Sequence, residues 1–210
     1  MEKILVVGAN GTTGKEIVNL LNESQYFEPY AMVRKSEQEQ QFTSKGIKTI
    51  LADLEQDVSG TTSGMDKVIF AAGSGGKNVK EVDENGAKKM IDASKKHNIK
   101  KFVMLSSMGA DQPEKADDLK EYLHAKHNAD MYLKESGLNY AIVRPGSLNN
   151  DMLTNKIELS EKLNKRGEIS RSDVAQVIAR VTNDDVANKK TFEIIGGQTL
   201  ITNAFSKIKV

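Results

Sequence analysis

The fold is decided by residues 3–18, Lys3-Ile4-Leu5-Val6-Val7-Gly8-Ala9-Asn10-Gly11-Thr12-Thr13-Gly14-Lys15-Glu16-Ile17-Val18. An apolar run of strand length ends at Gly8, three glycines follow at intervals of three, and apolar residues then recur at helical spacing. A strand, a glycine-rich turn and a helix in this order are the context in which glycines indicate a dinucleotide site. The alternative is an ordinary βα turn, but the strand, the spacing and the amphipathic helix together favour the dinucleotide site.

The glycines of this turn have separate physical roles. Gly8 permits the sharp turn out of the strand, Gly11 lets the backbone approach a pyrophosphate, and Gly14 lets the helix pack tightly on the sheet. The N–H groups of the first helical turn then face the phosphates, with the positive end of the helix dipole behind them. Thr12 and Thr13 are expected to cap the helix and to donate hydroxyl hydrogen bonds. The predicted phosphate-binding set is Gly8, Asn10, Gly11, Thr12, Thr13 and Gly14.

Composition excludes several functional classes. The 30 basic and 29 acidic residues leave a formal charge of +1, which gives no electrostatic reason to expect nucleic acid or an anionic membrane as a partner. The absence of cysteine excludes disulfides and thiolate chemistry. His124 and His127 lie one helical turn apart without a completing motif, so we interpret them as solvated and expect no metal site. No leader or long apolar segment is recognisable, and a cytoplasmic protein is expected.

Strands and helices alternate along the chain. The predicted strands are 3–7, 30–33, 48–52, 67–73, 101–105, 140–143 and 191–195, and the main later helices lie near 79–91, 119–135 and 174–181. With right-handed crossovers this pattern predicts an α/β, doubly wound parallel sheet of the Rossmann type with strand order 3-2-1-4-5-6-7. We expect a single domain over residues 1–210, in which residues 146–210 supply a small substrate-side region. The loop 147–151, together with the residues after it, is expected to form the substrate lip.

The residues after the second predicted strand indicate the preferred cofactor. In such a sheet the ligand lies outside the carboxyl ends of the strands, and NAD-preferring chains usually place an acidic residue at this position. Here the position holds Arg34 and Lys35. A guanidinium forms a fork with a ribose 2′-phosphate, so NADP is predicted, with NADPH preferred over NADH. The alternative is a solvated strand end.

Two further strand ends are expected at the cofactor. Asp53 and Leu54 follow the third predicted strand, where they could contact the adenine edge. Asp53 could equally be a turn former or helix cap. Ala71, Ala72 and Gly73 follow the fourth strand, and their small size would leave room for the ribose.

The helix near 119–135 carries the candidate catalytic residues. Its apolar stripe consists of Leu119, Tyr122, Leu123, Lys126, Ala129 and Leu133. A lysine in such a stripe is costly unless its ammonium has a partner. Tyr122 lies one turn before Lys126, and Ser106 and Ser107 end the fifth strand. These residues are the parts needed for carbonyl reduction, with Tyr122 passing a proton, serine polarising the carbonyl, and Lys126 stabilising the phenolate or holding the nicotinamide ribose. The alternatives are a buried aromatic ring and a snorkelling lysine.

Three longer motifs complete the pattern. They are Lys-Phe-Val-Met-Leu-Ser-Ser-Met-Gly-Ala at 101–110, Leu-Asn-Tyr-Ala-Ile-Val-Arg-Pro-Gly at 138–146 and Ser-Arg-Ser-Asp-Val-Ala at 170–175. With the glycine turn they make the chain resemble the atypical short-chain dehydrogenases/reductases of the small, single-domain NAD(P)H-binding kind, relatives of biliverdin reductase B (flavin reductase) and the NmrA-like proteins. The resemblance implies a Rossmann domain, NADP(H), and Pro145 and Gly146 on the nicotinamide side.

Two functions stay open at this stage. One is an NADPH-dependent oxidoreductase that reduces a small carbonyl, quinone or flavin. The other is a non-catalytic NADP(H)-binding sensor or regulator of the NmrA-like kind. Tyr122 favours the enzyme, because a sensor needs no proton donor. We expect a small-molecule substrate and a monomer or weak homodimer.

Overall fold

The structure, a computed structural model, describes residues 1–116 and 118–207. Its described part contains a nine-stranded sheet in the order β11-β8-β10-β6-β5-β4-β1-β2-β3. The parallel strands are β1 (Glu2–Val7), β2 (Phe27–Val33), β3 (Lys48–Leu51), β4 (Lys67–Phe70), β5 (Lys101–Leu105), β6 (Tyr140–Pro145) and β10 (Lys190–Gly196). The predicted order 3-2-1-4-5-6-7 is confirmed, with β10 as the seventh predicted strand.

Four short strands were not predicted. They are β7 (Ser147–Asn149), β8 (Lys156–Ser160), β9 (Glu168–Ser170) and β11 (Thr199–Leu200). β8 pairs antiparallel with β10 and β11, and β7 pairs with β9 in a separate two-stranded sheet. β7, β9 and β11 have three residues or fewer, so their sequences carry little of the alternation by which a strand is recognised.

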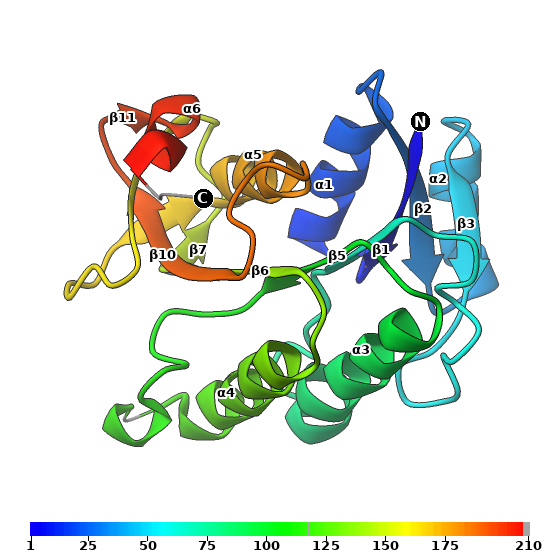
Figure 1. The fold of residues 1–210 in the computed structure, drawn as a ribbon, viewed down its shortest axis with the longest axis horizontal. Coiled ribbons are helices and arrows are strands. Elements are labelled where there is room, and N and C mark those ends of the chain that lie inside the picture. Colours follow the sequence, from blue (N-terminus) through cyan, green and yellow to red (C-terminus); the bar gives the residue numbers. More distant parts are fainter. Residues whose placement is uncertain (117, 208–210) are drawn as a thin grey trace.

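Helices cover both faces of the sheet (Figure 1). They are α1 (Thr12–Asn22), α2 (Gln40–Thr43), α3 (Gly86–Lys96), α4 (Lys120–Glu135), α5 (Arg171–Val181) and α6 (Ile201–Ala204), with short 3₁₀ segments at Ser36–Gln38, Pro113–Lys115 and Phe205–Lys207. α1 and α5 pack on one face and α3 and α4 on the other. Each face therefore has its own apolar core, as expected for a doubly wound sheet.

The predicted helix near 79–91 is divided. A π-helical segment, η2 (Val79–Asn85), comes first, and α3 begins at Gly86. A Cβ built on Gly86 would lie 3.0 Å from the Leu54 Cβ, so glycine allows this helix to approach the loop after β3 closely. π-helical turns are often associated with functional sites because they redirect side chains. Here the turn carries the buried Asp83.

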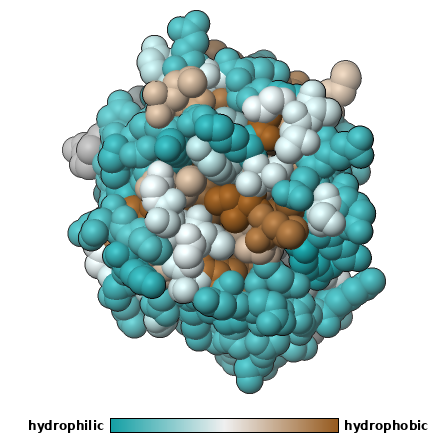
Figure 2. Space-filling view, turned by 90° about the vertical axis from the view of Figure 1, so that its right-hand side faces the viewer, coloured by the Kyte–Doolittle hydropathy of each residue, from teal (hydrophilic) through white to brown (hydrophobic). Residues whose placement is uncertain are grey.

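The face that β3 presents is mainly hydrophilic, with a small apolar patch near its centre (Figure 2). β3 contributes the exposed Leu51 to this side of the molecule. In the part of the chain that the structure describes, no helix combines the length and the apolar character needed to cross a bilayer.

Two buried lysines hold the amino ends of the central strands. The Lys67 Nζ at the start of β4 lies 2.6 Å from a Glu2 carboxylate oxygen and 2.7 Å from one of Asp184. The Lys101 Nζ at the start of β5 donates to the carbonyl oxygens of Asn183 (2.8 Å) and Val186 (2.6 Å). Both lysines therefore bind the segment that follows α5.

Lys101 is almost completely shielded from solvent and has no carboxylate within ion-pair distance among the described residues. Burial, with the like charge of Lys67 adding to it, lowers the pKa of Lys101 from 10.5 to about 8. The folded state therefore holds this proton less tightly than the unfolded chain does.

This difference makes stability depend on pH. Between about pH 8 and 10.5 the unfolded chain binds a proton at Lys101 that the folded chain lacks, so raising the pH stabilises the folded state. We expect the free energy of unfolding of the wild type, relative to Lys101→Met, to rise by about 2 kcal/mol between about pH 7.5 and about pH 10. Urea titrations at both pH values measure this difference.

Lys100→Met is the matched control. Hydrogen bonds to Asp66 and Glu2 raise the pKa of this partly exposed neighbour, so its charge persists through the same pH range. Lys100→Met should show no comparable rise. A flat pH profile for the Lys101→Met difference would show that the buried amine is not the group that titrates.

Candidate cofactor and substrate site

A first cavity of about 370 Å³ lies at the carboxyl ends of β1 and β4. Of the predicted cofactor residues, its walls include Gly8, Asn10, Gly11, Arg34, Asp53, Leu54, Ala71, Ala72 and Gly73. Parallel strands bring these distant segments to one edge of the sheet. Thr12, Thr13, Gly14 and Lys35 do not line it.

The glycine turn is set by close backbone contacts. Gly8 has φ +82°, and a Cβ on it would lie 2.6 Å from the Ala72 Cα. A Cβ on Gly14 would lie 2.2 Å from the Gly8 carbonyl oxygen. Only glycine permits both contacts, because real Cβ atoms do not approach other atoms this closely. The turn therefore locks β1, β4 and α1 together.

The expected capping role of the threonines is wrong. Gly11 is the N-cap of α1 and no side chain caps the helix. Thr12 is exposed to solvent, whereas Thr13 is buried in the interior. A glycine at the N-cap keeps the backbone open at the helix start, which leaves the end of the helix unshielded toward the cavity.

Arg34 and Lys35 are separated by the structure. The backbone N–H groups of both donate to the Gln38 Oε1, at 3.0 and 3.1 Å, and this fixes the turn after β2. Arg34 lines the cavity and Lys35 does not. Of the two cations, Arg34 is therefore the one placed to reach a ligand.

Asp53 makes a local turn contact and also faces the first cavity. Its Oδ1 accepts the Glu55 N–H at 3.0 Å, which is a local turn contact, and the residue also lines the cavity.

The small residues after β4 leave little spare space, since a Cβ on Gly73 would lie 3.3 Å from an Asp83 carboxylate oxygen.

The chemistry of these walls fits a dinucleotide. The Lys15 N–H donates to the Gly11 carbonyl at 2.9 Å, so the N–H groups before it remain outside the helical bonding pattern. The first turn of α1 carries no acidic side chain. The buried Ser74 Oγ has no hydrogen-bond partner among residues 1–116 and 118–207. These donors, with Arg34, suit phosphate groups.

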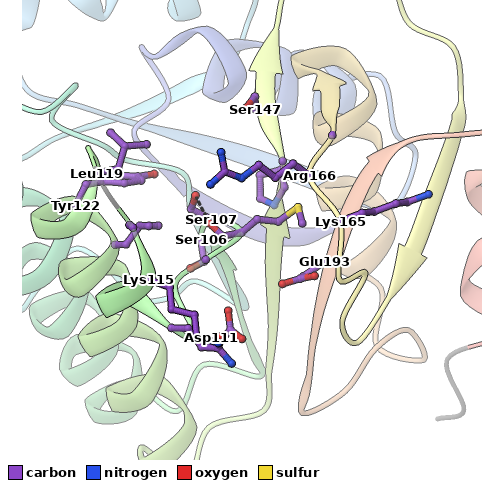
Figure 3. A pocket seen from close by; sticks show the side chains of 18 of the residues that line it. Ser106, Ser107, Asp111, Lys115, Leu119, Tyr122, Ser147, Lys165, Arg166 and Glu193 are labelled. Carbon is purple, nitrogen blue, oxygen red and sulfur yellow. Dashed lines mark hydrogen bonds between the residues drawn. The ribbon is translucent and has the colours of Figure 1, made fainter.

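A second cavity of about 580 Å³ lies at the ends of β5 and β6 (Figure 3). Its walls contain Ser106, Ser107, Tyr122, Pro145 and Gly146 from the predicted set. Ser147 and Leu148 of the predicted lip also line it, but Asn149, Asn150 and Asp151 do not. Several residues of the segment 162–167 were not predicted and complete the opposite wall.

The two serines after β5 have different roles. Ser106 is buried, and its Oγ donates to the Asp130 Oδ2 at 2.9 Å. Ser107 is half-buried, and among the described residues its Oγ forms a hydrogen bond only with the neighbouring Met108 carbonyl, at 3.2 Å. Ser106 is therefore held by the interior, which argues against the expectation that it polarises a substrate, and Ser107 is the serine whose hydroxyl can turn toward the cavity.

Asp130 is a central buried group that the sequence analysis missed. Arg144 donates to its Oδ2 from Nε at 2.9 Å and from a terminal nitrogen at 2.8 Å. Burial raises the pKa of Asp130, opposed by the Arg144 charge. Breaking such a buried pair is costly because one charge is left unpaired. An acid one turn after Lys126 on the same helix face was the available signal.

Lys126 is buried between Ala72 of the first cavity and Tyr122 of the second. Its Nζ lies 3.4 Å from the carbonyl oxygens of Ala72 and Leu105 and 3.4 Å from an Asp83 oxygen. The Tyr122 ring centroid is 5.6 Å away. The ammonium therefore has partners, and the snorkelling interpretation is wrong. Lys126 itself lines neither cavity.

Asp83 is the second buried acid that the sequence analysis missed. It is fully shielded, and its Oδ2 accepts the Ser74 N–H at 3.0 Å. Asp83 thus couples the loop over the first cavity to Lys126. No sequence signal pointed to it, because its position depends on the π-helical geometry of η2.

Among the described residues, no group of three or more His, Cys, Asp or Glu side chains is arranged to hold a metal ion. Both histidines are partly exposed, and each also has a protein partner. The His124 Nε2 lies 2.8 Å from a Glu114 oxygen, and the His127 Nδ1 lies 2.7 Å from the Ala110 carbonyl oxygen.

Comparison with known proteins identifies the family of the chain and several relatives. A family model described as NAD(P)H-binding matches residues 8–185. The chain is 36% identical over 214 residues to the uncharacterized sugar epimerase YhfK of Bacillus subtilis, and the match covers 98% of this chain and all of that protein.

Solved structures share the same architecture. A Bacillus halodurans protein, assigned provisionally as an NAD-dependent epimerase/dehydratase, has a TM-score of 0.94 and 37% identity, covering 99% of this chain and 100% of that one. The oxidoreductase ylbE from Lactococcus lactis has a TM-score of 0.89 and 33% identity, covering 98% and 96%.

The contact between Gly14 and Gly8 makes a direct prediction. Gly14→Ala places a methyl group on the Gly8 carbonyl oxygen, and such overpacking typically costs about 1–3 kcal/mol. We expect a lower thermal midpoint and weaker NADPH binding in fluorescence titrations. Gly60→Ala is the control, because nothing lies within 4 Å of its added Cβ. Equal midpoints and affinities for both variants would contradict the tight turn.

Proposed function

The chain belongs to the NAD(P)H-binding family, with the atypical short-chain dehydrogenase/reductase fold, and from this premise we propose that it is an NADPH-dependent reductase of a small carbonyl, quinone or flavin. The observation that carries the proposal is the group Tyr122, Ser107 and Lys126. Two hydroxyl-bearing residues line one cavity, and a buried ammonium lies behind the tyrosine ring. These are the proton donor, the hydrogen-bond donor and the charge that carbonyl reduction requires.

The first cavity supports NADP(H) as the cofactor. The glycine turn and the open end of α1 would hold the pyrophosphate, and Arg34 would bind the ribose 2′-phosphate. Ala71, Ala72 and Gly73 would lie beside the ribose. When bound, NADPH supplies the hydride for the reduction.

The residues of the second cavity would handle the substrate oxygen. Tyr122 would donate its hydroxyl proton to that oxygen, while the Ser107 hydroxyl stabilises the developing negative charge. Lys126 would stabilise the phenolate left on Tyr122. Asp83 and two backbone carbonyls hold the Lys126 ammonium in place, so the charge needs no rearrangement during the reaction.

The names of the relatives suggest a second reaction to be tested beside reduction. Sugar epimerisation returns the hydride to its substrate and causes no net oxidation of NADPH. A reductase consumes NADPH in step with its product. Measuring NADPH absorbance together with product formation on aldehydes, quinones, flavins and nucleotide sugars therefore separates the two. Binding of NADPH without turnover of any of these substrates would favour the alternative function, a non-catalytic NADP(H)-binding sensor or regulator.

Cofactor preference depends on Arg34. Removing one charge-assisted fork typically costs about 1.5–3 kcal/mol, which corresponds to roughly a 10–100-fold increase in Kd. We expect Arg34→Ala to weaken NADPH binding by this factor and to leave NADH binding unchanged, as measured by calorimetry. Lys35→Ala is the control, because Lys35 lies outside the cavity. Equal wild-type affinities for NADPH and NADH would contradict the assignment of Arg34 as the residue that binds the ribose 2′-phosphate.

Tyr122→Phe tests the proton donor, because it retains the ring but removes the transferable proton. For a carbonyl substrate we expect turnover to fall by about 10²–10⁴-fold while NADPH affinity stays constant. Lys126→Met should lower turnover and also weaken NADPH binding, since its ammonium joins the strand ends at the cofactor cavity.

Tyr132→Phe is the matched control on the same helix, because its hydroxyl donates to Asp92 (2.8 Å), away from both cavities. Its steady-state rates should match the wild type. Full activity of Tyr122→Phe on every substrate would make Tyr122 a packing residue. The reaction would then be direct hydride transfer to a flavin ring, which needs no tyrosine.

A further inference from the structure

The segment 161–167 carries three cations on the wall of the second cavity that faces Tyr122, and they differ in their partners. Lys162 forms an ion pair with Asp111. Lys165 forms an ion pair with Glu158 at 2.7 Å. Arg166 forms no ion pair or hydrogen bond within the described ranges 1–116 and 118–207. One cation of the three is therefore available to a ligand.

Side-chain direction supports this distinction (Figure 3). Arg166 extends across the cavity toward the side of Tyr122 and Leu119, whereas Lys165 extends the opposite way. A long side chain loses rotamer freedom when it is held in one direction, and a bound partner would compensate for that loss.

Three acids line this cavity: Asp118 is exposed, and the other two are already engaged. Asp111 is paired with Lys162, and the buried Glu193 accepts the Leu163 N–H at 2.7 Å. Their charges are thus directed into the protein's own contacts. A ligand group near Arg166 meets a guanidinium fork, which suits a carboxylate or phosphate.

We propose that Arg166 is a specificity-determining residue that binds an anionic group of the substrate, a carboxylate or a phosphate, and so directs the reducible part toward Tyr122 and Ser107. The inference rests on the proposed reductase function and names its substrate class. A fork contact is directional, so it fixes the orientation of a planar substrate as well as its affinity.

Matched ligand pairs in which only one member carries an anionic group test the proposal. FMN and riboflavin form the phosphate pair, and 4-carboxybenzaldehyde and 4-formylbenzamide form the carboxylate pair. Their Kd values are measured by calorimetry on the protein saturated with NADP⁺, which prevents turnover. We expect the anionic member of at least one pair to bind at least about 10-fold more tightly than its neutral partner.

Arg166→Gln should reduce that ratio to about one, and Lys165→Gln, the matched control on the same segment, should leave it unchanged. Equal affinities within both wild-type pairs, or no measurable binding of either anion, would overturn the proposal. An equal loss of NADP⁺ affinity in Arg166→Gln would also overturn it, because the guanidinium would then serve the cofactor.

Parallel assays of NADPH oxidation separate the two proposals. A charge preference that depends on Arg166, without turnover of any ligand, supports the anion-binding role of Arg166 and contradicts the proposed reductase function. Turnover of both members of a pair with equal Kd values supports the proposed reductase function and contradicts the anion-binding role of Arg166.

Discussion

The contact between Gly14 and the Gly8 carbonyl oxygen is the constraint on which the site depends. A side chain at Gly14 would force α1 away from the turn, and one at Gly8 would collide with Ala72 at the end of β4. These absent side chains let β1, β4 and α1 meet at one point. The end of α1 is thereby directed at the edge of the sheet, where its unbonded N–H groups would favour an anion. A single missing methyl group at each position thus creates the space for a cofactor.

Buried ion pairs then determine which side chains remain available beside the second cavity. Lys126 is balanced by Asp83, and Arg144 by Asp130. Buried charges of this kind need partners, so each pair restricts the elements that carry it. The Arg144 pair also occupies the Ser106 hydroxyl. The interior therefore selects between two adjacent serines of identical chemistry, and the hydroxyl that remains beside the cavity belongs to Ser107.

Local signals were enough to predict the sheet and most of the first cavity. The glycine spacing, the apolar strands and the small residues after β4 are all read within a few neighbouring positions. Partnerships across the chain were not accessible in this way. The position of Asp83 depends on a π-helical turn, the role of Asp130 on its contacts with Ser106 and Arg144 at two neighbouring strands, and the segment 162–167 on an antiparallel extension of short strands. The threonine caps failed for a related reason, since a glycine took the N-cap position itself.

The two cavities differ in how their walls are built. The first is made from strand ends and a turn whose geometry is fixed by backbone contacts, so a change there disturbs the fold as well as the ligand. The second is closed by a surface segment, and loops of this kind tolerate substitution without loss of the sheet. Substrate choice can therefore vary through residues such as Arg166 while Gly8, Gly14 and Lys126 keep their contacts. Fold and family thus account for the dinucleotide site, whereas the reaction depends on groups that face the second cavity.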